Sequence, residues 1–256
     1  MKATLTVLGS GTSMGVPTIG CTCRVCTSTD PHDRRLRPSV LVEYGGRHVL
    51  IDTTPDFREQ ALRAGLRKLD AVLYTHGHAD HILGLDDLRP LSFHSPGRVP
   101  LYVNHQTERT LRHTFHYFFD DENPYPSKAQ VEIKHLHGSI ELFGARFEPV
   151  PVLHGDEEIH GFRFGDAAYL TDMSEIPADS RAMLRGLDIL IIDALRHKPH
   201  PTHSTVENSL RLVAELAPKR AFFTHISHDL AHAETNAALP PHVRLAHDGL
   251  KLEFEI

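Results

Sequence analysis

The segment YTHGHADH, residues 74–81, places three histidines and an aspartate within six positions, directly after a short apolar run. On a helix, the side chains of His76 and His78 would diverge by about 200°, so these residues fit a turn that leaves a strand. Asp80 and His81 stand just before a helix-like apolar pattern. Buried imidazoles and carboxylates need partners, and one zinc ion does not take four adjacent ligands from one loop. The segment therefore predicts a pair of metal ions, with a solvated histidine turn as the alternative.

Length and composition limit the class of protein. The chain has 256 residues, enough for one large domain or two small ones, and its 40% hydrophobic and 23% charged residues are typical of a soluble globular protein. No apolar run approaches the roughly 18 residues that a membrane span needs, and the first residues show no signal-peptide pattern. We therefore expect a cytoplasmic protein without a membrane partner. A net charge of −6 without a long basic run argues against a nucleic-acid partner.

All three cysteines lie in one short loop, GCTCRVC. An odd number of cysteines argues against a disulfide scaffold. Cys21, Cys23 and Cys26 in a C-x-C-x-x-C pattern instead predict three ligands of a tetrahedral zinc site. The spacing does not identify the fourth ligand, and incidental loop thiols are the alternative.

Short apolar runs predict strands along the whole chain, and a 3.6-residue periodicity predicts helices between some of them. The expected strands lie at 4–8, 39–44, 48–51, 71–74, 100–103, 131–136, 146–153, 161–164, 167–171, 189–192, 221–224, 243–245 and 252–256. The expected helices lie at 57–64, 82–93, 106–116, 182–187 and 205–216. The first half has the pattern of hairpins, and the second half alternates strands and helices. This order predicts an α/β fold with two mixed sheets and helices outside them.

Further ligand-type residues follow apolar, strand-like runs elsewhere in the chain. These residues are His154 after PVPVL, Asp172 after AAYLT, His225 after AFFT, and the aspartates Asp52 and Asp193. Each alone fits a polar residue that ends a strand. Because α/β proteins place their sites at strand ends along one sheet edge, we expect these residues and the histidine segment to form a set.

The order of these residues resembles the metallo-β-lactamase fold superfamily of dinuclear metallohydrolases over nearly the whole chain. The resemblance implies a four-layer αββα sandwich of that type, as one domain over residues 1–256. The implied ligands are His76, His78, His154, Asp80, His81, His225 and Asp172. The three residues His76, His78 and His154 are implied to hold one metal. A second metal is implied to be held by Asp80, His81 and His225, and Asp172 is implied to bridge both. Asp52 is implied to support the ligand loop.

The Asp-His pair at 80–81 is similar to the phosphodiesterase and thioesterase branches of that superfamily. A closer resemblance lies in GSGTSMGVPTIGCTCRVC, residues 9–26, which is similar to the start of the phosphoribosyl 1,2-cyclic phosphate phosphodiesterase family, accessory to carbon–phosphorus lyase. The resemblance implies a structural zinc in the loop at 20–27, with His228 as its fourth ligand. It also implies a homodimer. The aromatic segment 113–126 does not map onto that family; a substrate pocket, a dimer contact and core packing all stay open for it.

The implied ligand set predicts the chemistry. Two neighbouring divalent cations lower the pKa of a bridging water, so that hydroxide exists near neutral pH, and they offset charge on a phosphoryl transition state. An alkoxide leaving group benefits from a proton, and His203 matches the position of the family's acid histidine. We therefore assign catalysis to His203 and to the metal-held Asp80. His197 and His200 are expected in the surface loop.

The expected function is a dinuclear metal-dependent phosphodiesterase that hydrolyses a small cyclic phosphate, such as phosphoribosyl 1,2-cyclic phosphate, by a metal-bridging hydroxide. Its cofactors are two divalent active-site metals, zinc or manganese, and one structural zinc. His/Asp sites accept several metals, so the sequence does not select one. The alternatives are a nuclease of the tRNA 3′-end processing type, a thioester or lactone hydrolase of the same fold, and a non-catalytic zinc scaffold.

Overall fold

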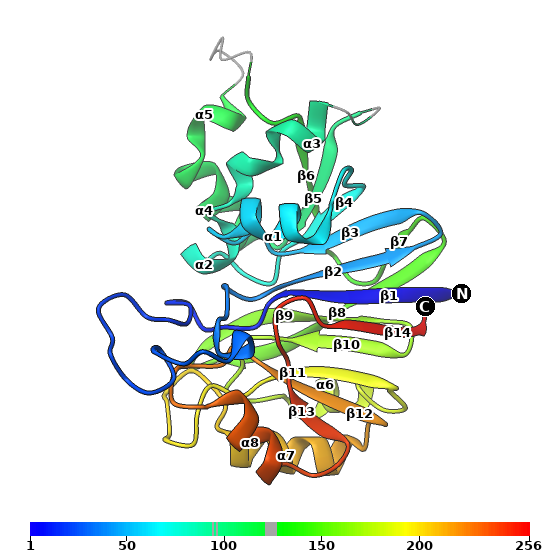
Figure 1. Ribbon diagram of the computed structural model, residues 1–256. Helices are drawn as coiled ribbons and strands as arrows, with labels where there is room; N and C mark the ends of the chain where they lie inside the picture. The colour runs from blue at the N-terminus through cyan, green and yellow to red at the C-terminus, as the bar shows by residue number, and fades with distance from the viewer. Residues whose placement is uncertain (94, 96, 121–126) are drawn as a thin grey trace.

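Two seven-stranded sheets form the centre of the computed structural model, which describes residues 1–93, 95, 97–120 and 127–256 (Figure 1). The first sheet has the spatial order β14 (Lys251–Glu255), β1 (Lys2–Gly9), β2 (Ser39–Tyr44), β3 (Arg47–Ile51), β4 (Ala71–Leu73), β5 (Val99–Val103) and β6 (Val131–His135). The second has the order β13 (Val243–Leu245), β12 (Arg220–Thr224), β11 (Ile189–Asp193), β10 (Ala167–Leu170), β9 (Glu157–Phe164), β8 (Ala145–His154) and β7 (Ile140–Leu142). Each sheet has a parallel part and an antiparallel part. The parallel part runs from β3 to β6 in the first sheet and from β10 to β13 in the second.

Helices cover the outer face of each sheet, so the layers follow the order α-β-β-α (Figure 1). The first sheet carries α1 (Phe57–Ala64), α2 (Ala79–Ile82), α3 (Arg89–Phe93), α4 (His105–Thr114) and α5 (His116–Phe119). The second carries α6 (Ala178–Met183), α7 (Val206–Leu216) and α8 (His232–Ala238). This arrangement confirms the predicted fold class. Within the described part of the chain, every helix is too short or too polar to cross a membrane.

The central strands are apolar because both of their faces are buried. Successive residues of a strand point to opposite faces. In β11, Ile189 and Ile191 therefore pack between the sheets, whereas Leu190 and Ile192 pack under the outer helices. Such double burial produces continuous apolar runs rather than alternating ones, which is typical of parallel strands in α/β proteins.

The helix predicted at 82–93 is wrong as a continuous element. The segment divides into α2, a 3₁₀ turn at Leu85–Leu88, and α3. The backbone N–H of Gly84 donates to the carbonyl of Thr53 at 2.9 Å, outside the helix. This tertiary contact replaces the helical hydrogen bond that the periodicity alone would predict.

Two further expectations about the elements are wrong. The helix predicted at 182–187 lies at Ala178–Met183, with Pro177 as the residue before its first turn. In the first half of the chain, β2 and β3 form the expected hairpin, but strands and helices alternate from β3 through α1 and α4 to β6. The prediction missed β7 and α8 altogether.

Candidate metal centre

The strand-end residues singled out in the sequence lie along one edge of the two sheets. Asp52 follows β3, His76 and His78 follow β4, Asp172 follows β10, and His225 follows β12. Asp52, Asp172 and His225 also have positive φ angles of 67°, 55° and 57°. This backbone region costs a non-glycine residue roughly 1–3 kcal/mol and clusters at functional sites. The local strain thus coincides with the predicted site.

His76, His78 and His154 form the first cluster. The Nε2 atom of His76 lies 3.0 Å from Nδ1 of His78, and the His154 ring centroid is 5.6 and 5.2 Å from the other two rings. The Nδ1–H of His154 donates to the carbonyl of Thr202 at 3.0 Å, which leaves Nε2 as the free ligand nitrogen. Burial lowers the pKa of His76 well below its ordinary value and also lowers the pKa of His154. Both imidazoles are therefore in the neutral form that binds a metal.

Asp80, His81, Asp172 and His225 form the second cluster. The Nε2 atom of His81 lies 3.1 Å from Oδ2 of Asp172 and 3.2 Å from Oδ2 of Asp80. The other oxygen of Asp172, Oδ1, lies 3.1 Å from Nε2 of His225. Asp172 also groups with His154 of the first cluster. Its carboxylate thus lies between the two clusters, as a bridging ligand must.

Unpartnered atoms in the second cluster test whether these residues fit a metal. The buried atoms Asp80 Oδ2, His81 Nε2 and His225 Nε2 make no well-aligned hydrogen bond to any described residue, although they lie 3.1–3.7 Å from oppositely charged atoms of the same cluster. A buried polar atom without a well-formed hydrogen bond is costly, up to about 1–3 kcal/mol when it has no partner at all. Here several such atoms converge on one point, and a mixed set of imidazoles and carboxylates suits zinc or manganese. The residues present fit the implied ions.

Asp52 contacts the ligand loop rather than the centre of the site. Its Oδ1 accepts the backbone N–H of Thr75 at 2.9 Å, and its Oδ2 accepts the Thr75 hydroxyl at 2.8 Å. The same Oδ2 lies 2.8 Å from Nδ1 of His81. A proton on Nδ1 then directs Nε2 of His81 toward the second cluster.

His203 lies against both clusters. Its ring stacks on His225 with centroids 4.6 Å apart, and it lies 4.8 Å from the ring of His154. Its Nδ1 is 3.1 Å from Oδ2 of Asp193, a buried carboxylate at the end of β11. The sequence marked Asp193 as a strand-end aspartate without a role. Its contact shows that it orients His203.

The loop around His203 differs in part from expectation. His197 is exposed, as predicted, and its Nδ1 lies 2.6 Å from Glu207. The ring of His200, however, is half-buried and lies 4.9 Å from the ring of His203, so it borders the site. The hydroxyl of Thr205 caps α7 by accepting the backbone N–H of Asn208, which anchors the chain just after His203.

The three cysteines converge on His228. Their Sγ atoms lie 3.2, 3.6 and 3.4 Å from Nδ1 of His228, in the order Cys21, Cys23 and Cys26. A hydrogen bond from the backbone N–H of Cys26 lowers the pKa of Cys23 to about 7, which favours the thiolate that zinc binds. The alternative, incidental loop thiols, does not explain why three Sγ atoms lie around one histidine nitrogen. A Cys₃His set is typical of a closed structural zinc site.

Replacing Cys26 with serine is expected to remove one zinc per chain and to lower the melting temperature by about 10 °C. The expectation follows from a destabilisation of roughly 3 kcal/mol on loss of a metal ligand, at about 3 °C per kcal/mol for a chain of this size. Metal analysis and thermal unfolding measure both effects. Thr22→Ala, at an exposed position of the same loop, is the matched control. Unchanged zinc content in Cys26→Ser would contradict the role of Cys26 as a zinc ligand.

The aromatic segment 113–126 packs on the core where the structure describes it. Phe115 and Phe118 are buried in the apolar layer between the first sheet and its helices. This supports the core-packing alternative for residues 113–120. Residues 121–126 lie outside the described part of the chain.

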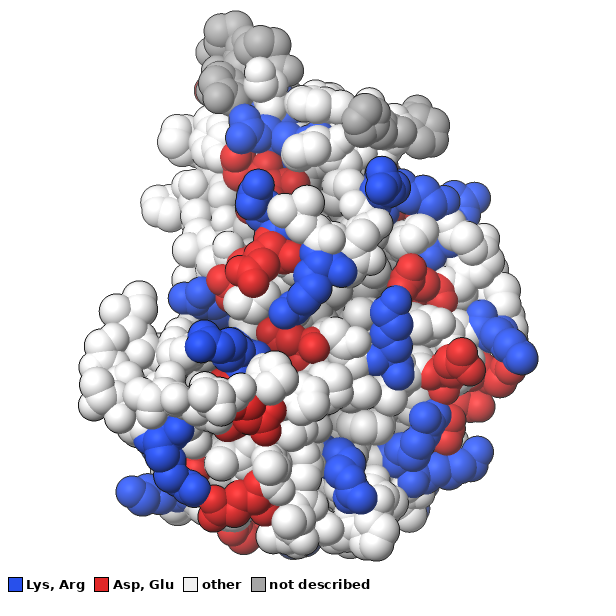
Figure 2. Space-filling view, viewed as in Figure 1, with Lys and Arg blue, Asp and Glu red and all other residues white. Residues whose placement is uncertain are grey.

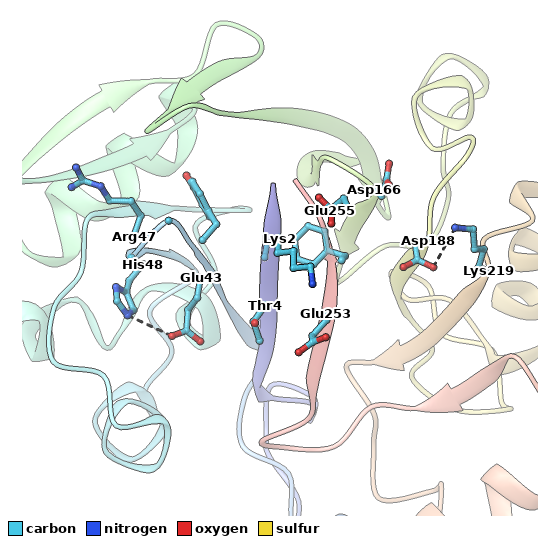
Figure 3. Close-up of a pocket in the computed structure, with 15 residues that line it drawn as sticks. Lys2, Thr4, Glu43, Arg47, His48, Asp166, Asp188, Lys219, Glu253 and Glu255 are labelled. Carbon is cyan, nitrogen blue, oxygen red and sulfur yellow. Dashed lines mark ion pairs between the residues drawn. The ribbon is translucent and has the colours of Figure 1, made fainter.

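The site opens on the side of His78, whose side chain is 49% exposed, whereas those of His81 and His225 are fully buried. A separate surface hollow of about 650 Å³ lies at the opposite ends of the strands (Figure 3). Lys2, Glu43 and Glu253 belong to its lining. The hollow contains none of the predicted site residues, so the strand edge with the histidines is the candidate site.

Comparison with known proteins gives a consistent set of relatives. The family model described as the beta-lactamase superfamily domain matches residues 47–226. A crystal structure described as a new diphosphatase from the PhnP family is 66% identical and covers 99% of this chain and 98% of that chain, with a TM-score of 0.94. An octanoyltransferase of Porphyromonas gingivalis is 40% identical over 96% of this chain, which spans only 50% of that protein's length. Zinc-bound PqqB from Methylobacterium extorquens, 21% identical over 97% of this chain and 99% of that chain with a TM-score of 0.78, shares the fold.

Proposed function

The chain belongs to the beta-lactamase superfamily and, within it, to the PhnP family, and we propose that it is a dinuclear metal-dependent hydrolase of small phosphoric diesters. The observation that carries the proposal is the position of Asp172. One of its oxygens faces His81, the other faces His225, and the residue also groups with His154. A single carboxylate in contact with both clusters supports two ions held a few ångströms apart rather than one.

The proposed mechanism divides the work between bound ions and this chain's own residues. The seven ligand residues would hold two divalent ions, zinc or manganese, at the strand edge. Such ions would lower the pKa of a bound water and offset charge on the phosphoryl oxygens. The Asp193 carboxylate, 3.1 Å from Nδ1 of His203, keeps a proton on that nitrogen and directs Nε2 toward the substrate. His203 then donates a proton to the departing oxygen as general acid.

The proposed substrate is a small molecule with a disubstituted phosphate. The family resemblance of the N-terminal loop favours a ribosyl cyclic phosphate. The 66% identical relative is described as a diphosphatase, which makes a diphosphate ester the second candidate. In both, water attacks a phosphorus that carries two ester or anhydride oxygens.

A small substrate also agrees with the charge of the molecule, which is −6. On the face that Figure 2 shows, Lys and Arg are interspersed with Asp and Glu, without a broad basic area. This favours a small anionic ester over transfer RNA, whose phosphates need an extended basic surface.

The proposal also includes a cytoplasmic location and a homodimeric state.

A substrate panel tests the proposal with the chain loaded with zinc or manganese. We expect kcat/KM for bis(p-nitrophenyl) phosphate, a ribosyl 1,2-cyclic phosphate or a diphosphate ester to exceed that for a thioester and a lactone by at least about 100-fold. Precursor tRNA, tested in the same buffer, is expected to stay uncut. Turnover of the thioester, the lactone or the precursor tRNA without turnover of any of the small phosphoric esters would assign the chain to another branch of the superfamily.

A further inference from the structure

Another group of metal-ligating side chains lies at the exposed end of the first sheet, apart from the two clusters and the cysteine loop. His105 is the first residue of α4, Glu108 lies one turn later on the same helix face, and His135 ends β6. The parallel strands β5 and β6 pair Val103 with His135. The helix that follows β5 therefore begins beside the end of β6, which brings the three side chains together.

One carboxylate oxygen is the point where these side chains meet. Oε2 of Glu108 lies 2.5 Å from Nε2 of His135 and 4.0 Å from Nδ1 of His105. The centroids of the two imidazole rings are 4.3 Å apart, and ligand atoms of all three residues lie within 4.8 Å of one another. The other oxygen, Oε1, accepts the Nε–H of Arg112 at 2.7 Å. Arg112 thus fixes the carboxylate plane and leaves Oε2 to the imidazoles.

The spacing suits a four-coordinate ion after a small adjustment. Bonds of about 2.0–2.2 Å in a tetrahedral zinc site place neighbouring ligand atoms roughly 3.3 Å apart. The contact between His135 and Glu108 has to open, and that between His105 and Glu108 has to close, each by less than about 1 Å. The side chains of His135 and His105 are 35% and 66% exposed, so rotation about their side-chain bonds achieves both changes.

A simple ion pair accounts for only part of this arrangement. A surface pair between His135 and Glu108 stabilises the fold by at most about 1 kcal/mol and gives no reason for His105 to approach the same oxygen. A third imidazole, His137, has its ring centroid 5.9 Å from that of His105 and 5.7 Å from that of His135. Two imidazoles beside one carboxylate, with a third imidazole next to them, are a donor set typical of transition-metal sites.

We propose that His105, Glu108 and His135 bind one further divalent transition metal of the zinc type, with water or His137 in the fourth position. Nitrogen donors favour such an ion over calcium or magnesium, which prefer oxygen ligands. The three residues take no part in the proposed dinuclear centre. Whether a metal ion binds to these three residues is therefore independent of the proposed function.

The site also borders the candidate active site. Gln106, the residue after His105, donates from its side chain to Oε1 of Glu157 at 2.8 Å. The other oxygen of Glu157 lies 3.8 Å from Nε2 of His78, the exposed ligand of the first cluster. The additional ion thus lies along the same sheet edge, on the open side of that site.

Equilibrium dialysis of the full chain against zinc, with metal analysis, tests the proposal in solution. The wild type is expected to bind one zinc per chain more than His105→Ala and one more than His135→Ala. His113→Ala, which removes an exposed histidine on the same helix, is expected to keep the wild-type count. His105 is two-thirds exposed, so its replacement is the safer variant for folding, and circular dichroism verifies that both variants fold.

Anomalous diffraction at the zinc edge locates the ion in crystals of the same protein. The expected result is a peak between the three side chains in the wild type. In His105→Ala this peak disappears while the peaks at the other sites remain. Equal zinc counts in wild type and both cluster variants, or a filled cysteine site without a peak at this cluster, would overturn the proposal.

Discussion

Replacing Asp172 with alanine is expected to empty at least one of the two active-site metal positions and to lower kcat by roughly 10⁴-fold or more. Its two oxygens lie 3.1 Å from Nε2 of His81 and 3.1 Å from Nε2 of His225. The substitution removes a carboxylate that lies next to both clusters, so we expect the remaining ligands to hold two ions at a short separation poorly. Metal analysis of the dialysed variant, together with steady-state kinetics on a phosphodiester, measures both effects.

Two companion variants make the Asp172 experiment decisive. Asp172→Asn keeps the size of the side chain but removes its charge, so it separates loss of metal from loss of packing. Glu175→Ala removes an exposed carboxylate three residues further along, and it is expected to keep wild-type metal content and turnover. An Asp172→Ala protein that retains both ions and its activity would contradict the bridging role.

Replacing His203 with alanine is expected to lower kcat by about 10²–10⁴-fold while leaving the metal content unchanged. The imidazole stacks on His225 and faces Asp193, but it is not part of the predicted ligand set. A general acid matters most when the leaving oxygen is strongly basic. We therefore expect the loss to be large for an alkyl phosphodiester and small for a p-nitrophenyl ester, whose leaving group needs no proton.

The dependence on the leaving group distinguishes a proton donor from a residue that only packs against the metal ligands. Asp193→Asn is expected to show the same pattern with a smaller loss, because the amide no longer holds the proton on Nδ1 of His203. His197→Ala, in the same loop but exposed, serves as the control. An equal loss for both esters would exclude the acid role, and loss of metal would make His203 a ligand instead.

Sequence patterns predicted the layers of the fold because burial on both faces leaves a clear signal. The run Ile189–Asp193 is continuously apolar up to its last residue, as a central parallel strand requires. Helix boundaries were less predictable, since they depend on contacts from distant parts of the chain. The helix predicted at 82–93 divides where the Gly84 N–H binds the carbonyl of Thr53. Periodicity carries no information about such a contact.

The candidate site was predictable where its residues crowd together in the chain and less so where each stands alone. The high density of ligand-type residues at 74–81 can be recognised from the sequence alone. The strand ends at His154, Asp172 and His225 follow the same pattern of an apolar run before a ligand-type residue. Asp193 carried no assigned role, because its function depends on a contact with His203 that only folding creates. The cluster at His105 was missed because exposed histidines leave no pattern of burial.

The comparisons confirm the recognised superfamily and the class of metal-dependent hydrolase. The dinuclear centre, the diester substrate and the roles of individual residues are proposals that the structure supports through geometry. They depend on one physical arrangement, in which histidines from three strand ends and a helix converge on the carboxylate of Asp172.

Anomalous diffraction from crystals of the chain grown with manganese in the active site tests that arrangement most directly. The expected result is two peaks, one among His76, His78 and His154 and one among Asp80, His81 and His225, with the Asp172 carboxylate between them. Magnesium-grown crystals provide the background. A single peak, or none at these residues in a protein that hydrolyses phosphodiesters, would contradict the dinuclear account.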